Sequence, residues 1–294
     1  MSYARRFLNV SFRLGEGAFT QGGNTAVLPD GLRIAANVVM AGDSAMNELK
    51  LRVYGMPLEL MNRLTVLGKP IVAGRLNSVI VEASDSDNET PSTVFIGTIF
   101  QAWADLNAPP DGVFVVSAQT GPIDALRPIP PTSYNGAVDV ALAIQSLATQ
   151  MGHLFENNGV TAQISSPYLS GTGLDQVQSL VEAAGINWVL DGNTIAIWPR
   201  DGARGGTSVL ISPDHGMIGY PIWTEGGVIV KTLYDPNIQF GRKIRIESDI
   251  KPATGTWVVS RVEHDLSSET PDGPWFTTVE AYFASHVEEG FNLG

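Results

Sequence analysis

Hydrophobic and polar residues alternate along much of the first 121 residues. The alternation begins at RFLNVSFRL, residues 6–14, and returns in later runs rich in β-branched and aromatic residues. These later runs cover residues 32–41, 48–56, 78–84, 93–105 and 112–119. Glycine, proline and polar residues separate them, which is typical of antiparallel strands. Residues 57–68 differ, because their leucines and Met61 form a helical stripe that predicts one short helix.

A change of composition after these strands predicts a domain boundary. Prolines crowd the segment GPIDALRPIPPTSYNG, and proline fixes φ and cannot donate to a sheet, so we expect a stiff connector. The next segment places Val140, Ile144, Leu147, Met151 and Leu154 at helical spacing, which predicts an amphipathic helix that ends at Asn158-Gly159. A second helix is predicted over GLDQVQSLVEAAG. Two helices beside short strands predict a small α+β module.

The segment INWVLDGNTIAIWPRDG, residues 186–202, predicts a β-hairpin. Asp-Gly is a strong signal for a tight reversal, and apolar residues lie on both sides of it. We expect Val189, Leu190, Ile195 and Ile197 to cover the two helices. Trp188 or Trp198 is then left as an anchor for a neighbouring chain.

From residue 207 onward the β pattern returns in five runs, of which KIRIESDI, GTWVVSRVEHDL and PWFTTVEAYF alternate most clearly. The fold class is therefore predicted as mainly β with an α+β insert: two antiparallel β-barrels flanking a small module. The predicted domains are residues 1–121, 122–206 and 207–294. The polar end HVEEGFNLG has no periodic pattern, and we expect it to order only against a neighbour, which makes His286 and Phe291 candidate interface residues.

Composition restricts the classes of function. Of 294 residues 44% are hydrophobic and 16% are charged, which favours an ordered globular chain. No run approaches the ~18 apolar residues of a membrane span, and the start lacks a signal-peptide pattern, so we expect synthesis in the cytoplasm and no membrane insertion. The absence of cysteine excludes disulfides and thiolate chemistry. A net charge of -12 disfavours nucleic-acid binding but suits a duct past which DNA slides.

The sequence contains no complete motif of a known catalytic or metal-binding site. The four histidines are scattered without metal-ligand spacing, and the acidic run EASDSDNET lacks the glycine and glutamate of a calcium loop. Phosphate-loop and nucleophile-elbow patterns are absent. A carboxylate pair such as Glu263 and Glu280, on neighbouring predicted strands, could mimic a glycosidase, but most such pairs belong to solvated faces. We therefore predict no enzyme, no cofactor and no metal.

The six tryptophans are spread singly along predicted strands. Tryptophan in this distribution is more often core or interface anchor than a stacking platform for sugars or bases, because it buries a large area and needs only one hydrogen-bond partner. A platform would need several tryptophans on one exposed face. Trp188, Trp198 and Trp223 complete the candidate interface residues.

Several packing and turn signatures resemble one known family. They are GMIGYP at residues 216–221, GTW at 255–257, VEH at 262–264 and the strand around Trp275. With the module segments quoted above, they resemble the baseplate or tail hub proteins of tailed bacteriophages, over most of the chain. The resemblance implies two barrels related to tail-tube subunits plus inserted modules, and three copies in a ring.

What the resemblance implies for function is structural. The ring would join the sixfold tail tube to the threefold central spike and enclose the DNA channel. The excess of acidic side chains would line this channel and repel DNA. Implied partners are two further copies, subunits of the tail tube or a distal ring, the spike and the tape measure protein, in the virion baseplate. Two alternatives stay open: a receptor- or carbohydrate-binding tail-tip component, and a cell-wall hydrolase.

Overall fold

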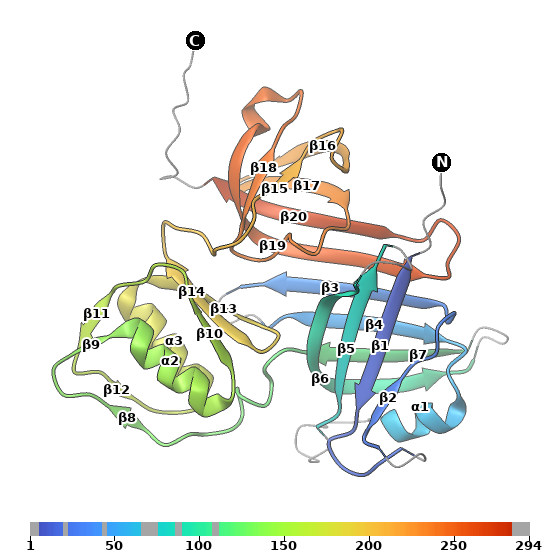
Figure 1. The fold of residues 1–294 in the computed structure, drawn as a ribbon, viewed down its shortest axis with the longest axis horizontal. Helices are drawn as coiled ribbons and strands as arrows, with labels where there is room; N and C mark the ends of the chain where they lie inside the picture. The colour runs from blue at the N-terminus through green and yellow to red at the C-terminus, as the bar shows by residue number, and fades with distance from the viewer. Residues whose placement is uncertain are drawn as a thin grey trace. The chain divides into compact units, whose positions relative to one another are not determined.

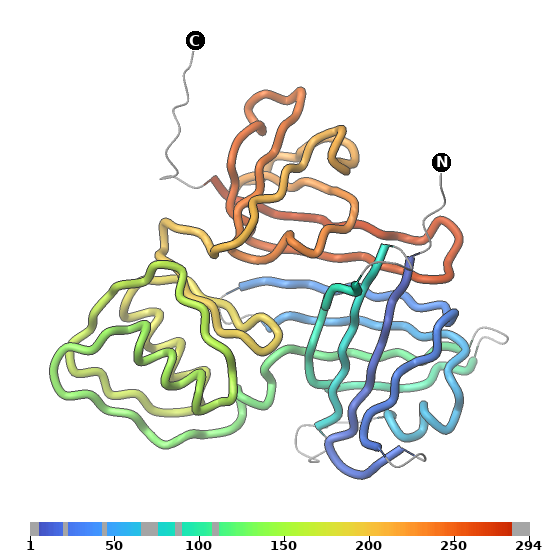
Figure 2. The backbone as a smooth tube through the Cα atoms, viewed as in Figure 1, coloured from blue at the N-terminus to red at the C-terminus, as the bar shows by residue number. Residues whose placement is uncertain are grey.

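The structure is a computed structural model that describes residues 6–19, 23–42, 46–65, 76–85, 90–107 and 112–283. Figure 1 shows a mainly β chain with few helices, and Figure 2 follows its backbone from end to end. The chain divides into two compact units. Unit 1 comprises Met1–Met40, Met46–Ile123 and Glu263–Thr277, and unit 2 comprises Ala41–Ala45, Asp124–Val262 and Thr278–Gly294. The predicted boundaries at residues 121 and 206 stay a prediction.

Unit 1 is built from antiparallel strands in which alternate residues are buried. The strands are β1 (Phe7–Arg13), β2 (Thr25–Val27), β3 (Ile34–Ala41), β4 (Glu48–Tyr54), β5 (Ser78–Ser84), β6 (Ser92–Asp105) and β7 (Val113–Gln119). They are hydrogen-bonded in the order β3-β4-β7-β6-β5-β1-β2. Val10, Phe12, Leu51 and Phe114 have no exposed surface, because each occupies the inward position of its strand. The alternating runs of the sequence therefore correspond to strands with one buried face.

The short predicted helix is present as α1 (Leu58–Leu64), which buries Met61 and Leu64. Pro57 lies just before the helix rather than inside its first turn. The helix ends at Leu64, because Thr65 is already extended, and not at Gly68 as predicted; Gly68 itself lies outside the described residues.

The predicted closed barrels are not observed. Among the described strands of unit 1, the order is an open path that ends at β2 instead of returning to β3. The register between β6 and β7 shifts between Ile99 and Gln101, so the 14-residue strand β6 bends along its length. Its first half pairs with β5 and its second half with β7, and Figure 1 shows β5 and β1 running steeply across the direction of β3 and β4. Alternation predicts strands and faces, but it does not determine whether the last strand meets the first.

The α+β module forms the first part of unit 2. Its elements are β8 (Thr132–Ser133), β9 (Ala137–Asp139), α2 (Val140–Met151), β10 (Leu154–Asn157), β11 (Gln163–Ser165), β12 (Tyr168–Leu169), α3 (Gly173–Ala184), β13 (Ile186–Asp191) and β14 (Thr194–Pro199). Asp139 caps α2 by accepting from the Leu142 amide. The predicted helix end at Asn158-Gly159 is wrong: Gly152 ends α2 with a φ of +85°, and Leu154 lies in strand β10. Thr172 and Asp175 form a capping box that starts α3.

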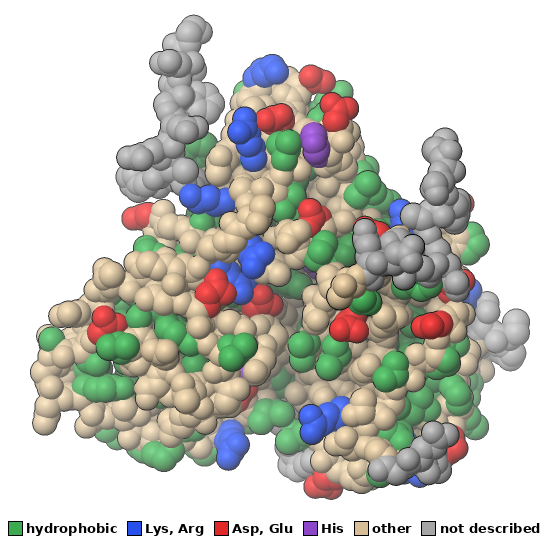
Figure 3. All heavy atoms as spheres, viewed as in Figure 1, with side chains coloured by type: hydrophobic (Ala, Val, Ile, Leu, Met, Phe, Trp, Pro, Cys, Tyr) green, Lys and Arg blue, Asp and Glu red, His purple; other side chains and the backbone are tan. Residues whose placement is uncertain are grey.

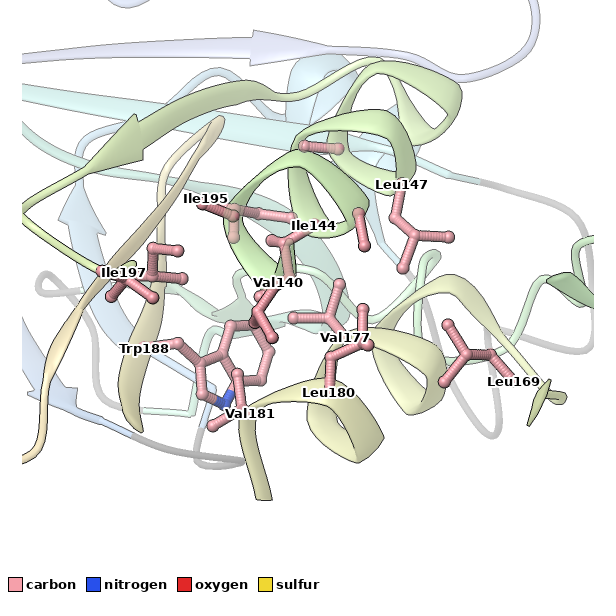
Figure 4. Packing of buried hydrophobic residues seen from close by; sticks show 14 residues of the cluster. Val140, Ile144, Leu147, Leu169, Val177, Leu180, Val181, Trp188, Ile195 and Ile197 are labelled. Atoms are coloured by element: carbon pink, nitrogen blue, oxygen red, sulfur yellow. The ribbon is translucent and has the colours of Figure 1, made fainter. Parts of the chain in front are cut away.

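Figure 4 shows how the two helices bury their apolar faces against the hairpin β13–β14. Ile144 and Leu147 of α2 meet Val177 and Leu180 of α3, and all four are buried. The parallel partner β10 completes a three-stranded sheet in the order β10-β14-β13. The module predicted from the sequence therefore folds around one hydrophobic core.

The rest of unit 2 is β-rich. It contains β15 (Val209–Ile211), β16 (Met217–Thr224), β17 (Gly227–Leu233), β18 (Lys243–Ile246), the 3-10 turn η2 (Lys251–Ala253), and parts of β19 (Gly255–Ser268) and β20 (Trp275–Phe283). The strand order is β16-β17-β20-β19-β3, and β18 pairs with both β15 and β19. β19 changes units along its length: residues 255–262 belong to unit 2 and residues 263–268 to unit 1. Here too the described strands form an open path, and β16 lies at its end.

Candidate functional site

The hairpin β13–β14 is covered on both faces. Trp188, Leu190, Ile195 and Ile197 belong to one face and contact the helices, and Trp188 Nε1 donates to Gln178 Oε1 at 2.8 Å. Three of the four residues predicted to cover the helices do so. Val189, the fourth, lies on the opposite face, since neighbouring residues of a strand point to opposite sides.

The second face of the hairpin packs on the β-rich part of unit 2. Val189, Ala196 and Trp198 form a small buried cluster with Phe240, and the rings of Trp198 and Phe240 lie 5.8 Å apart at their centroids. Gly241 makes this approach possible. Its φ is +79°, and a Cβ at this position would lie 2.6 Å from the Trp198 ring. The hairpin is therefore scaffolding between two apolar surfaces.

A buried arginine fixes the chain just after the hairpin. The Arg204 side chain is 5% exposed and carries two carboxylate partners: Nη1 contacts Asp191 Oδ2 at 2.7 Å, and Nη2 contacts Glu156 Oε2 at 3.0 Å. The Arg204 amide donates to the Gly241 carbonyl at 2.7 Å. One residue thus joins β10, the hairpin turn and the segment before β18 (Figure 1).

The charges of this cluster shift one another's proton affinity. Burial by itself raises the pKa of Glu156, but hydrogen bonds from Arg204 and its positive charge outweigh burial and leave this pKa below its ordinary value. Burial works against the charged form of Arg204, and its two carboxylate partners reverse the effect, so the pKa of Arg204 is raised. Both groups are therefore stabilised in their charged forms.

The histidines do not assemble a catalytic or metal site in the described part of the chain. His153 contacts Asp124 Oδ2 at 3.0 Å and Asn193 Oδ1 at 2.8 Å; the Asp124 hydrogen bond, opposed by burial, raises the pKa of His153. His264 is buried, and burial lowers its pKa to about 4. No group of three metal-ligating side chains is found among the described residues. These histidines tie segments of the chain together.

The edge strand β16 exposes apolar side chains on both of its faces. We call the β16 patch the set Ile218, Tyr220, Ile222, Trp223, Leu233 and Phe283, all exposed. Ile222 is 64% exposed and lies opposite Ile229 of β17. Trp223 is 50% exposed and meets the buried Trp257 edge-on at 5.9 Å, and Phe283 meets Trp257 from a second direction at 5.4 Å.

The β16 patch is unusual for an edge. Met217–Thr224 carries no charged side chain, although exposed edge strands of soluble proteins are commonly protected by charge. Large exposed apolar patches mark interaction sites. The β16 patch is therefore the strongest candidate assembly surface in the described part of unit 2.

Comparison with known families decides the class of protein. The family model described as "Baseplate hub gp41" matches residues 7–281. The chain belongs to this family of phage baseplate hub proteins. The resemblance seen in the sequence is thereby confirmed, and the chain belongs among the structural components of the virion tail.

Solved structures share the fold at low sequence identity. The tail protein from Neisseria meningitidis MC58 superposes with a TM-score of 0.62 and 10% identity, covering 94% of this chain and 96% of that one. The 43 kDa tail protein of prophage MuSo2 from Shewanella oneidensis gives 0.60 and 9%, covering 94% and 97%. The E. coli c3393 protein, a type VI secretion component, gives 0.55 and 11%, covering 85% and 73%. A comparison with curated protein sequences finds no match.

The predicted interface residues of this hub chain fall into three groups. Trp188 and Trp198 are buried inside the chain, so they have little surface to offer a neighbour. Trp223 is exposed and belongs to the β16 patch. His286 and Phe291 lie outside the described residues.

Tyr220 and Ile222 were missed at the sequence level. The sequence feature that could have identified them is the uncharged run MIGYPIWT, residues 217–224. In this run apolar residues occupy both alternating sets of positions, so both faces of the strand are apolar. The hub chain also carries no helix, in the residues described, with the length and apolarity to traverse a bilayer.

Proposed function

We propose that three copies of this hub chain form a ring that joins the sixfold tail tube to the threefold spike and encloses the DNA channel. The observation that carries this proposal is the family match across residues 7–281. The fold adds support, because two tail proteins superpose along almost their whole length. The c3393 protein is itself structurally similar to the T4 tail proteins gp27 and gp5, and another similar structure is a PdpA–VgrG complex. The ring would thus have spike and tube proteins as partners.

The open strand orders fit a role that is completed by assembly. Three chains, each with two β-rich regions, supply six similar units, which matches a sixfold tube above a threefold spike. Each β-rich region would act as a tail-tube-like unit, and its exposed edge would be covered by a neighbour. The exposed edge at β16 is the described surface that supports this view.

The charge of the chain supports passage of DNA without specific binding. Three copies at -12 each would surround the channel with an excess of carboxylates, which repels phosphate. Figure 3 shows acidic side chains interspersed with basic ones on the face that it presents. DNA would therefore slide through the ring.

The native mass of the purified chain, followed over a concentration series and then with the spike co-expressed, tests the proposal. We expect a trimer and, in threefold-averaged electron micrographs, a ring with an axial channel. A chain that forms no threefold ring either alone or with the spike would contradict the proposal.

The carbohydrate-binding alternative has less support. It requires tryptophans clustered on an exposed face, but Trp188, Trp198, Trp257 and Trp275 are buried and Trp223 is the most exposed of the six. The hydrolase alternative has no assembled catalytic set in the described residues. Clearing of peptidoglycan in a zymogram would reopen it.

A further inference from the structure

The β16 patch needs a partner that packs against side chains instead of adding a strand. Pro221 in the middle of β16 has no N–H to donate, and the pairing of β16 with β17 shifts register between Ile218 and Ile222. Both features interrupt a regular hydrogen-bond ladder. The exposed rings and isoleucines remain free to pack.

Unit 1 carries a second exposed apolar surface, on the outer side of β2, β1, β5 and β6. Ser11 of β1 lies opposite Val27 on one side and Ile80 on the other, and Ile80 lies opposite Ile96. Val27 is 67% exposed, and Ile80 and Ile96 are also exposed. These four residues form one cross-strand line, which we call the isoleucine row. It contains no charged residue.

We propose that the β16 patch of one copy packs on the isoleucine row of the next copy. The proposal rests on the proposed three-copy ring and names its contact surfaces. A cyclic ring of three needs two different surfaces per copy, because each chain meets its neighbours head to tail. The β16 patch and the isoleucine row supply one such surface in each unit.

Charge favours a second copy as the occupant of both surfaces. Every copy carries a net charge of -12, so copies repel one another wherever carboxylates would meet. Strand Met217–Thr224 and the isoleucine row contain no charged residue, and the charged residue opposite Ile218 is a lysine, Lys231, so no carboxylates meet across these positions. If the partner were a strongly basic protein, we would expect an acidic patch in place of these uncharged surfaces.

The area fits a stable contact. The isoleucine row exposes on the order of 250 Å², so one contact buries on the order of 500 Å² of apolar surface from the two partners together. A polar rim supplies the rest of the ~1,200 Å² at which specific interfaces begin. The same contact repeats three times around a closed ring.

The test uses three variants of the full chain. Ile222→Asp breaks the β16 patch, and Ile80→Asp breaks the isoleucine row. Leu142→Asp on α2 is the matched control, because Leu142 is also 64% exposed but belongs to neither surface. Analytical ultracentrifugation gives the mass of each, and circular dichroism with thermal melting checks the fold. If an aspartate variant does not fold, Trp223→Ser or Ile96→Ser takes its place.

We expect wild type and Leu142→Asp to be trimers, and the other two variants to be monomers at concentrations at least tenfold above the wild-type dissociation range. An equimolar mixture of Ile222→Asp and Ile80→Asp should give a dimer and no trimer. The first chain keeps an intact isoleucine row and the second keeps an intact β16 patch, so one contact forms but the ring does not close.

Other outcomes overturn the inference. A wild-type trimer that survives either substitution, or a mixture that yields no dimer, shows that these two surfaces are not partners and leaves the three-copy ring intact. A wild-type chain that stays monomeric by itself would show that the β16 patch and the isoleucine row do not hold two copies together. Co-expression with the spike then tests the three-copy ring separately.

Discussion

Replacing Arg204 with methionine should destabilise the hub chain strongly. The substitution keeps an unbranched apolar stem but removes the charge that Asp191 and Glu156 share, leaving two carboxylates without their partner. Removing one member of a fully buried ion pair costs about 3–5 kcal/mol. Because Asp191 and Glu156 are 27% and 33% exposed, water screens part of the loss, and we expect about 2–3 kcal/mol.

Urea unfolding at pH 7, followed by tryptophan fluorescence, measures the loss. The matched control is Arg245→Met, since Arg245 contacts Glu247 at 3.1 Å on the surface, where an ion pair contributes little. The triple variant Arg204→Met, Glu156→Gln, Asp191→Asn should recover part of the stability, because the two carboxylates are no longer charged. The recovery stays partial, since Arg242 loses the same two carboxylates. A loss for Arg204→Met no greater than that of Arg245→Met would refute the reasoning.

The same variant predicts a pH dependence. The pKa of Glu156 is lowered in the folded chain, so its contribution is present above the ordinary glutamate pKa and is lost as pH falls through the lowered value. The difference in unfolding free energy between wild type and Arg204→Met should therefore shrink in acid. A difference that stays constant from pH 7 to pH 3 would show that the loss is not electrostatic.

Three further predictions concern packing and protonation. Leu147→Ala, at a buried position of α2, should cost about 2–5 kcal/mol in urea unfolding, whereas Leu142→Ala on the exposed side of the same helix should cost under about 1 kcal/mol. Because burial lowers the pKa of His264 to about 4, the folded chain should lose up to about 3 kcal/mol between pH 6.5 and 4, and His264→Gln should flatten that slope; an unchanged slope would assign it to other groups. Gly241→Ala should lower the melting temperature more than Gly136→Ala, since both have positive φ but only Gly241 has the Trp198 ring within reach of a Cβ, and equal shifts would contradict this contact.

Much of the local structure could be predicted from the sequence. The alternating runs became strands, the 3–4 spacing gave α2 and α3, and Asp191-Gly192 gave the hairpin. These features depend on residues close together in the chain. Closure of the sheets was predicted wrongly, because it depends on strand bends and on pairing between distant segments.

The candidate site was only partly predictable. Trp223, a predicted interface residue, is exposed in the β16 patch, and its contact with a neighbour stays a prediction. Trp188 and Trp198 were also predicted as interface residues, and the structure buries both within the chain. Trp198 is buried by contact with Phe240, which lies 42 positions later in the chain. A local sequence pattern cannot predict a contact between such distant residues. Arg204 likewise has no sequence signal, because Glu156 and Asp191 reach it only after the module has folded.

The passage of β19 between the two units has a consequence for the order in which the chain is made. Strand β3 pairs with β19, so unit 1 needs residues 263–277 before its sheet is complete. A ribosome delivers β3 more than two hundred residues earlier, and the core of the α+β module is available in between. Nascent unit 1 must wait with a bare sheet edge while unit 2 begins to fold, and a prematurely terminated product would keep that edge permanently open to aggregation.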